Sequence, residues 1–449
     1  MDRPTAPVTA GVAGAAPASA TPPRELGFWT AVALVVGNMI GSGVFLLPAS
    51  LAAYGGLSLV GWLVSATGSL LLAVVFARLA RLDPASGGPY AYTRRAFGSL
   101  PGFLVAWGYW ISVWSANAAL AVAFVGYLDP FIPSIVRAPA ASALLAIATL
   151  WFLTAVNISG IRAAGRLQVV TTALKIVPLV VIAIAGLIRF TPASFAIHES
   201  STRTLTVDLM SVVTLTLWAF LGLECATIPA GSVRDPDRTI PRATVTGTMV
   251  AAGIYILSTI GIMSLIAPAA LASTTAPFAD AARTIGGDRA AALVAIGAAI
   301  SCFGALNGWV LIVGQLPLAV ARDGLFPPLF ARLTQRGTPA AGMILSGILS
   351  TVLIAMNYSR GLVALFTFTI LLATLSTLVP YLMCSLAALL ISLGRLRVRH
   401  AVSTGGAAVA AAAVCYSFVA IIGAGREVIS WGAVLLAAGL PVYLWMRRA

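Results

Sequence analysis

Residues 36–45 read Val-Gly-Asn-Met-Ile-Gly-Ser-Gly-Val-Phe and interrupt the first long apolar segment of the chain. Glycine and serine weaken a helix, and hydrocarbon offers no water to the backbone groups that a broken helix leaves unpaired. Such a break survives at membrane depth only where protein or a water-filled cavity covers it. The free N–H groups and the positive dipole end of the following half-helix suit a carboxylate. The stretch therefore predicts a transporter that binds an amino-acid-like solute near the bilayer midplane.

The composition is that of a membrane protein. Of the 449 residues, 60% are hydrophobic and only 9% are charged, whereas a soluble domain carries about 25% charged residues. The net charge of +14 comes almost entirely from arginine in short loops, which is the bias that orients inner-membrane proteins and gives no sign of nucleic-acid binding. The four cysteines lack metal-ligand spacing, so the sequence predicts neither a metal site nor a cofactor.

Twelve apolar segments approach or exceed the roughly 20 residues that a membrane-spanning helix needs. They lie at about 28–53, 58–80, 101–127, 139–158, 166–189, 209–231, 241–266, 290–320, 338–357, 361–393, 403–423 and 428–446. The prediction is an all-α integral membrane protein with twelve transmembrane helices. Residues 1–24, rich in Ala, Pro and Thr, are expected to be a disordered cytoplasmic tail. Residues 25–393 would form a ten-helix transport core, and residues 394–449 would add helices eleven and twelve.

The arginines predict the orientation of the chain. With the N-terminus inside, nineteen arginines lie on the cytoplasmic side, and an even number of spans returns the C-terminus there. The outer side would hold Arg137, Arg189, Arg203, Arg283, Arg289, Arg360 and Arg426. Three cytoplasmic loops, 83–90, 234–238 and 322–328, combine turn residues with opposed charges; they are either solvated turns or parts of an inward gate. We expect a multi-pass protein of the bacterial inner membrane with both termini cytoplasmic.

The sixth span is interrupted like the first. Residues 217–225 read Leu-Trp-Ala-Phe-Leu-Gly-Leu-Glu-Cys, with a glycine and a charge at membrane depth, and Pro229 follows. Two interrupted helices that lie five spans apart fit a five-plus-five inverted repeat whose opening helices break at a shared site.

Two ionisable groups lie inside spans. Glu224 is the one acidic residue deep in a span, and Lys175 lies about ten residues into the fifth span. Because intramembrane charges are costly, each is a candidate for proton exchange during transport. The alternatives are a structural hydrogen bond for Glu224 and, for Lys175, snorkelling toward the interface or pairing with Glu224.

Aromatic and amide side chains accompany the breaks. Trp218 lies at the sixth-span break, Trp309 follows Asn-Gly in the eighth span, and Tyr109 shares the third span and roughly one helix face with Asn117. Any of these aromatic rings could serve only for packing or for the membrane interface. Because they accompany a broken helix and the amide of Asn117, a role in substrate binding is favoured for these rings.

Four motifs resemble those of the amino acid–polyamine–organocation transporters, and most of all the basic amino acid/polyamine antiporters that exchange arginine and agmatine in enteric bacteria. The motifs are Gly37-Asn38-Met39-Ile40-Gly41-Ser42-Gly43-Val44-Phe45-Leu46-Leu47-Pro48-Ala49, Gly87-Gly88-Pro89-Tyr90-Ala91-Tyr92, Asp323-Gly324-Leu325-Phe326-Pro327-Pro328 and Leu378-Val379-Pro380-Tyr381. The likeness covers nearly all of residues 25–445, and it implies a LeuT-like 5+5 inverted repeat with broken helices 1 and 6.

The resemblance implies a role for each matching residue. Ser42 and Gly43 would bind the substrate carboxylate, and the backbone carbonyls of Met39, Trp218 and Leu221 would bind its α-ammonium. Asn117 would bind the distal polar group of the substrate, Trp309 would stack on a guanidinium, and Asn38 would help to shape the pocket. Trp218 would be an aromatic gate over the substrate. The further gate residues implied by the resemblance are Tyr109, Glu224 and Tyr381 in one layer and Tyr90 in an outer layer. Glu224 would be the proton-responsive group.

The chain also departs from those antiporters. Ser112, Val113, Leu120 and Ala373 occupy pocket positions where the antiporters carry other residues, which makes the pocket more apolar in part. Lys175 has no counterpart there. Proton-coupled members of the same superfamily carry a lysine in this span, where it would stand in for the sodium ion of other relatives, with Ser301 as a neighbour.

We therefore expect a secondary active transporter of amino acids, with a cationic amino acid/amine exchanger favoured over a proton-coupled symporter of neutral amino acids that uses Lys175. Protons, the lipid bilayer and the small-molecule substrate are its expected partners, and the resemblance also implies a homodimer. A non-transporting nutrient sensor of the same fold is a distant alternative. An enzyme is not expected, because neither a His/Asp/Glu cluster nor a nucleophile dyad is visible in the sequence.

Overall fold

The computed structural model describes residues 24–190, 192–195, 205–274, 276–360, 363–396, 405–423 and 426–448, and within them no side chain of 193–194, 357–375 or 427. The expected tail at 1–24 lies outside this part of the chain except for Arg24. The helices are α1 (Phe28–Met39), α2 (Gly43–Leu51), α3 (Leu57–Leu82), α4 (Pro89–Phe97), α5 (Ser99–Gly126), α6 (Pro133–Val136), α7 (Pro139–Ser159), α8 (Ile161–Ile188), α9 (Leu205–Trp218), α10 (Pro236–Leu265), α11 (Pro268–Ser273), α12 (Pro277–Arg322), α13 (Ala340–Arg360), α14 (Val363–Ser392), α15 (Gly405–Gly423), α16 (Arg426–Ala437) and α17 (Gly439–Arg448). Short 3₁₀ turns lie at Ala52–Tyr54, Pro192–Phe195, Ala230–Ser232 and Pro328–Ala331.

The predicted all-α membrane fold is confirmed. Among the described residues, eight helices are long and apolar enough to span a bilayer, and the bent pair α1 and α2 makes a ninth span. Three shorter apolar helices, Leu205–Trp218, Ala340–Met356 and Ser376–Ser392, fall at the sixth, ninth and tenth predicted positions. Each of the twelve predicted segments is therefore matched by an apolar helix.

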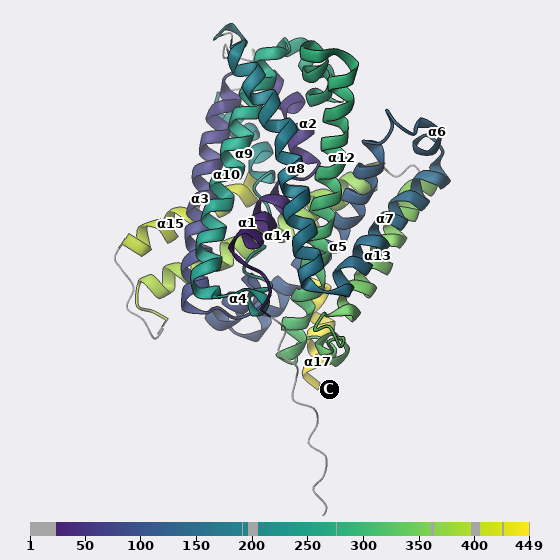
Figure 1. The fold of residues 1–449 in the computed structure, drawn as a ribbon. Helices are drawn as coiled ribbons and strands as arrows, with labels where there is room; N and C mark the ends of the chain where they lie inside the picture. The colour runs from purple at the N-terminus through teal and green to yellow at the C-terminus, as the bar shows by residue number, and fades with distance from the viewer. Residues whose placement is uncertain are drawn as a thin grey trace, which may run out of the picture.

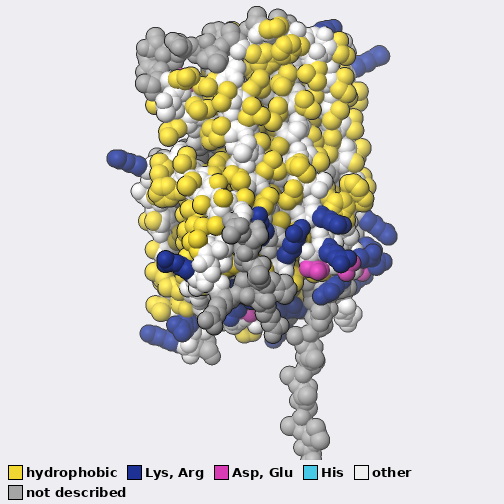
Figure 2. Space-filling model, turned by 90° about the vertical axis from the view of Figure 1, so that its left-hand side faces the viewer, with side chains coloured by type: hydrophobic (Ala, Val, Ile, Leu, Met, Phe, Trp, Pro, Cys, Tyr) yellow, Lys and Arg dark blue, Asp and Glu magenta, His cyan; other side chains and the backbone are white. Residues whose placement is uncertain are grey.

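The helices form one tall bundle (Figure 1). Residues of α1 pack against α8, α10 and α12, while α5 packs against α12 and α14, so the interrupted first span lies within the bundle. Hydrophobic side chains cover most of the face in Figure 2, as expected of a surface that meets lipid. Basic side chains gather at its lower end, the end at which α4, α17 and the C-terminus lie in Figure 1. We call this the basic end.

The eighth predicted span, 290–320, falls on the long part of α12. The helix runs from Pro277 to Arg322, but Gly286 and Gly287 have non-helical φ/ψ and kink it, so the predicted start lies just after the kink. The segment before the kink carries Asp280 and Arg283, which form an ion pair at 2.5 Å. Apolar patterning therefore locates only the part of this helix that crosses hydrocarbon.

Candidate functional site

The first span breaks at the predicted position. Helix α1 ends at Met39 and α2 begins at Gly43, with an angle of 44° between the two halves. The first residues of a helix have no intrahelical acceptor for their N–H groups, so the amides of Ser42 and Gly43 can bind an anion, while the Phe45 amide donates to the Ser42 carbonyl at 3.2 Å. The Ser42 side chain makes no capping bond to them, and Ser42 is only half-buried.

The sixth span breaks beside the first. Helix α9 ends at Trp218, and turns continue through residues 219–229 in place of the predicted helix. Gly222 has φ +109°, a conformation that glycine adopts readily. The Trp218 ring lies directly on Gly43: a Cβ atom built at Gly43 would lie 1.9 Å from Cζ3 of Trp218. The N-terminus of α2 and the C-terminus of α9 therefore meet under this ring.

Two of the carbonyls expected to bind the substrate α-ammonium can each accept a further hydrogen bond. The Met39 carbonyl accepts a bond from the Gly41 amide at 3.1 Å, and the Trp218 carbonyl accepts one from the Leu221 amide at 3.3 Å. A carbonyl oxygen has two lone pairs, so each can accept a second donor. Trp218 and Leu221 are both half-buried.

Glu224 is fully buried and forms a layer with two tyrosines. The hydroxyls of Tyr109 on α5 and Tyr381 on α14 each donate to one oxygen of its carboxylate. The Tyr381 hydroxyl also accepts the Gly222 amide at 3.1 Å. The three residues assigned to a gate layer by resemblance thus come together and connect the sixth-span break to α5 and α14.

The remaining pocket candidates line α5 and α12. Trp309 lies between Tyr109, with ring centroids 6.5 Å apart, and Gly222, where a built Cβ would lie 3.2 Å from Cζ2 of Trp309. Asn117 is 1% exposed, and its Oδ1 atom has no hydrogen-bond partner. Leu120 lies beside Gly41 of the break.

The substituted positions are partly visible. The Ser112 hydroxyl donates to the Tyr109 carbonyl at 2.8 Å, so it is bonded within its own helix. Val113 is buried. The side chain of Ala373 lies outside the described residues.

Lys175 on α8 is fully buried, which rules out the snorkelling alternative. Its ammonium donates to the carbonyls of Gly37 at 2.9 Å, Ile40 at 2.7 Å and Ser301 at 3.0 Å. The Ser301 hydroxyl in turn donates to the Ile40 and Gly41 carbonyls, both at 3.1 Å. The lysine thus neutralises carbonyl dipoles at the end of α1, and the contacts recorded for it do not include Glu224.

A second cluster of hydrogen-bonded side chains lies on α4 and at the end of α12. Tyr90 on α4 is fully buried, and its hydroxyl donates to Asp323 at 2.8 Å, while Arg94 pairs with the same carboxylate at 2.6 Å. Burial, followed by the bond to Asp323, raises the pKa of Tyr90 far above its usual value. Gly88 allows the loop before α4 to approach Thr227 in the sixth-span turns. The bond between Tyr90 and Asp323 shows that two of the three charged loops singled out in the sequence, 83–90 and 322–328, contact each other.

Some neighbours were not expected from the sequence. The Asn38 amide donates to Cys225 Sγ at 3.1 Å, and its oxygen accepts a bond from Gln168 at 3.4 Å. Among the described residues, no group of three or more His, Cys, Asp or Glu side chains could hold a metal ion.

Comparison with known proteins agrees with this architecture. A family model described as amino acid permease matches residues 26–443. The cadaverine/lysine antiporter of Escherichia coli (strain K12) is 35% identical over 367 residues, which cover 80% of this chain and 82% of the antiporter. The putrescine transporter of Haemophilus influenzae is 34% identical over 421 residues, or 94% of this chain and 96% of the transporter. A provisionally named arginine/ornithine antiporter of Bacillus subtilis is 32% identical over 397 residues, or 82% and 84% of the two chains. The chain therefore belongs to the amino acid permease family, within the amino acid–polyamine–organocation superfamily and its basic amino acid/polyamine antiporters.

Proposed function

We propose that the protein is a secondary active transporter that exchanges a cationic amino acid for another cationic amino acid or an amine. Its relatives are named for lysine and cadaverine, for putrescine and for arginine and ornithine, all of which carry a cationic side chain or amine. In this proposal the protein resides in the bacterial inner membrane, with the basic end facing the cytoplasm.

One observation carries the proposal: the two helix breaks meet where Trp218 lies on Gly43. The amides at the start of α2 present positive partial charge, and the carbonyls at the ends of α1 and α9 present negative partial charge. A substrate α-carboxylate would bind the amides of Ser42 and Gly43. Its α-ammonium would bind the carbonyls of Met39, Trp218 and Leu221. A zwitterion fits these opposed ends better than a simple anion or cation does.

The proposed head-group region favours a cation. The buried Asn117 Oδ1 atom is an acceptor without a partner, so a substrate ammonium or guanidinium would satisfy it. The rings of Trp309 and Tyr109 lie 6.5 Å apart on α12 and α5, and a cation over the face of either ring would gain about 0.5–2 kcal/mol. Asn38 would shape the floor of the pocket, and Ser112, Val113, Leu120 and Ala373 would line its walls.

A gating role fits the two hydrogen-bonded layers. The layer of Tyr109, Glu224 and Tyr381 would separate the substrate from the cytoplasm, and the Tyr90–Asp323 contact would form an outer layer. Opening toward the cytoplasm would break both. Since Glu224 would change its bonding to the tyrosines on protonation, we assign proton sensing to this carboxylate.

A second candidate is proton-coupled symport of a neutral amino acid. The observation that favours it is the burial of Lys175 against three carbonyls at the first-span break. Loss of its proton would leave these carbonyls without a cationic donor and would loosen the end of α1. The apolar Val113 and Leu120 also suit a neutral side chain.

Counterflow in proteoliposomes tests the proposal. Vesicles loaded with unlabelled lysine, arginine, ornithine, putrescine, cadaverine, leucine or alanine are diluted into a labelled trace of each, with and without a pH gradient. Exchange predicts uptake that requires a cationic internal partner and persists without the gradient. Uptake of labelled leucine into empty vesicles under an inward proton gradient would support symport instead. A protein that binds these compounds but moves none of them would be a sensor.

A further inference from the structure

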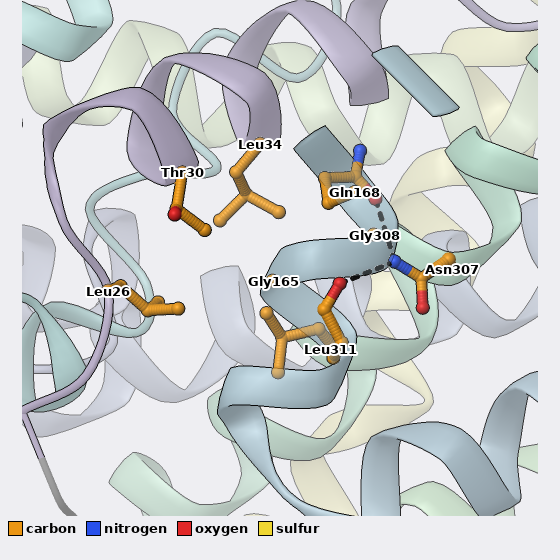
Figure 3. Close-up of a pocket in the computed structure, with 9 residues that line it drawn as sticks. Leu26, Thr30, Leu34, Gly165, Gln168, Asn307, Gly308 and Leu311 are labelled. Atoms are coloured by element: carbon orange, nitrogen blue, oxygen red, sulfur yellow. Dashed lines mark hydrogen bonds between the residues drawn. The ribbon is translucent and has the colours of Figure 1, made fainter. Parts of the chain in front are cut away.

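A chain of side-chain amides crosses the bundle below the transport site. The Asn157 amide on α7 donates to Asn307 Oδ1 on α12 at 3.0 Å, and Asn307 donates to Gln168 Oε1 on α8 at 2.9 Å. Gln168 then donates to Asn38 Oδ1 at 3.4 Å, and Asn38 donates to Cys225 Sγ at 3.1 Å. Figure 3 shows the central bond between Asn307 and Gln168. The chain thus joins α7, α12, α8, α1 and the sixth-span break.

Backbone carbonyls fix the direction of each amide. The same nitrogen atoms also donate to the carbonyls of Leu153 at 2.9 Å, Ala164 at 3.1 Å and Ala33 at 3.3 Å, respectively from Asn157, Asn307 and Gln168. A carbonyl can only accept, so none of these three amides can turn over without losing a bond. The Asn38 oxygen consequently faces Gln168 and its nitrogen faces Cys225.

Two glycines provide the space for the chain. A Cβ atom built at Gly37 would lie 2.1 Å from Nε2 of Gln168, and one built at Gly308 would lie 1.8 Å from Oδ1 of Asn38. Neither glycine has a positive φ, so backbone conformation does not require glycine at either position. The absence of a side chain at both positions lets Gln168 and Asn38 approach each other, so this amide contact depends on the two glycines.

A small cavity lies beside the amide chain. We call the packing of α1 against α8 and α12 at this place the α1 seam. The cavity lies between α1, α8 and α12, and its volume of about 10 Å³ is enough for about one water molecule. Thr30 and Leu34 line it from α1, and Gln168 and Asn307 are among the residues that line it from α8 and α12 (Figure 3). Leu34 precedes Asn38 by one helical turn, so the cavity and the Asn38 end of the amide chain lie on adjacent turns of α1.

We propose that Gln168 and Asn307 are positioning residues for transport: they hold Asn38 against Cys225 and keep α1 packed on α8 and α12, so that solvent from the cavity does not reach the transport site. This inference rests on the proposed function for its effect on substrate affinity. The effect of Gln168 and Asn307 on the packing of α1 against α8 and α12 does not depend on which substrate the protein transports.

A double-mutant cycle tests the first effect. Gln168→Met removes the three hydrogen bonds of this side chain, with Asn38, Asn307 and the Ala33 carbonyl, at similar volume. We expect it to raise KM for cationic exchange about three- to tenfold with turnover changed less than about twofold. Asn38→Ala should raise KM as well, and the double variant should be no worse than Asn38→Ala alone. Ser346→Ala is the matched control, because it removes a buried 3.0 Å bond from Trp110 between α5 and α13, away from Asn38. Additive effects of Gln168→Met and Asn38→Ala, or an equal KM change in Ser346→Ala, would overturn the proposal.

Cysteine labelling tests the second effect without transport. A Leu34→Cys variant, with exposed Cys415 changed to Ser, is treated with a small maleimide in the presence and absence of Gln168→Met. We expect labelling of Leu34→Cys to become at least about fivefold faster in the Gln168→Met background, since loss of about 1 kcal/mol of restraint has that effect. The native Cys302 and Cys384 are buried, make no bond to this amide chain and report any general unfolding, whereas Cys225 contacts Asn38 and is replaced by Ser in all of these proteins. An unchanged labelling rate, or equal gains at the native cysteines, would contradict a specific seam.

The two measurements separate the possible failures. Faster labelling without detectable exchange of any cation would reject the proposed function and retain the seam. Normal exchange with neither a KM change nor faster labelling in Gln168→Met would reject the positioning role and retain the function.

Discussion

Adding one methyl group at Gly43 should displace the Trp218 ring. The built Cβ of Gly43 lies 1.9, 2.6 and 2.8 Å from three ring carbons, while ordinary contact begins near 3.4 Å. In Gly43→Ala the ring must therefore move by about 1.5 Å, as judged from the shortest of these distances. The backbone itself accepts alanine, because Gly43 is helical. The strain thus falls on the contact that joins the two breaks.

The expected cost follows from that displacement. Overpacking of a close-packed site costs typically about 1–3 kcal/mol. If Trp218 closes over the substrate as proposed, most of this cost appears as weaker binding, roughly five- to hundredfold in KM or Kd. Isothermal titration with the purified protein and counterflow in proteoliposomes measure the two quantities independently.

Gly41→Ala is the matched control in the same break. Its built Cβ lies 3.5 Å from Cδ2 of Leu120 and 3.7 Å from Cβ of Ala305, which are ordinary contacts. We expect its Kd to stay within about twofold of the parent protein, since such a change should cost less than about 0.5 kcal/mol. A Gly43→Ala protein that binds normally, or a Gly41→Ala protein that loses binding equally, would refute the assignment of the site to the Gly43–Trp218 contact.

Four other substitutions test the remaining parts of the site. Lys175→Ala should abolish uptake driven by a pH gradient while counterflow persists, and gradient-driven uptake at the full rate would remove the coupling role. Glu224→Gln should flatten the pH profile of exchange, measured as initial rate against pH; a retained profile would move proton sensing elsewhere. Trp309→Leu should weaken arginine binding by about 1–2 kcal/mol through loss of the cation–π contact, and equal arginine affinity in the two proteins would remove that contact. Tyr90→Phe removes the bond to Asp323 but should leave the shape of the pH profile of exchange unchanged below about pH 10. The raised pKa of Tyr90 keeps its hydroxyl protonated throughout that range, so the contribution of this bond is lost only at higher pH. A Tyr90→Phe profile shifted near neutral pH would contradict this reasoning.

The helix breaks could be predicted because their cause is local. Glycines and serine in an apolar run weaken a helix wherever it lies, and the structure interrupts the first span at residues 40–42. The sixth-span break was also predicted from Gly222 and Glu224, although its second half is a series of turns and not the expected helix. The start of the eighth span could be placed to within a few residues, because Gly286 and Gly287 separate the apolar part of α12 from the charged segment before it.

The partners of the buried polar groups could not be predicted. Lys175 stands out in the sequence as a charge at membrane depth, but two of the carbonyls that it contacts belong to Gly37 and Ile40, and a backbone acceptor leaves no mark on residue type. The amide chain has the same difficulty. Gln168 and Asn307 lie 139 residues apart in sequence, and neither belongs to a motif that predicts their contact.

The segment just before α1 has a mechanical consequence for the whole transporter. The amides of Glu25 and Leu26 donate to the Ser232 carbonyl at 2.9 and 3.0 Å, and the Arg234 amide donates to the Leu26 carbonyl at 2.9 Å. These bonds tie the entrance of the first span to the chain that leaves the sixth. The start of α1 and the chain that follows the sixth-span turns must therefore move together, or three backbone bonds must break in each cycle. Moving either segment alone would require more free energy than moving the two together, because only the separate movement breaks these bonds.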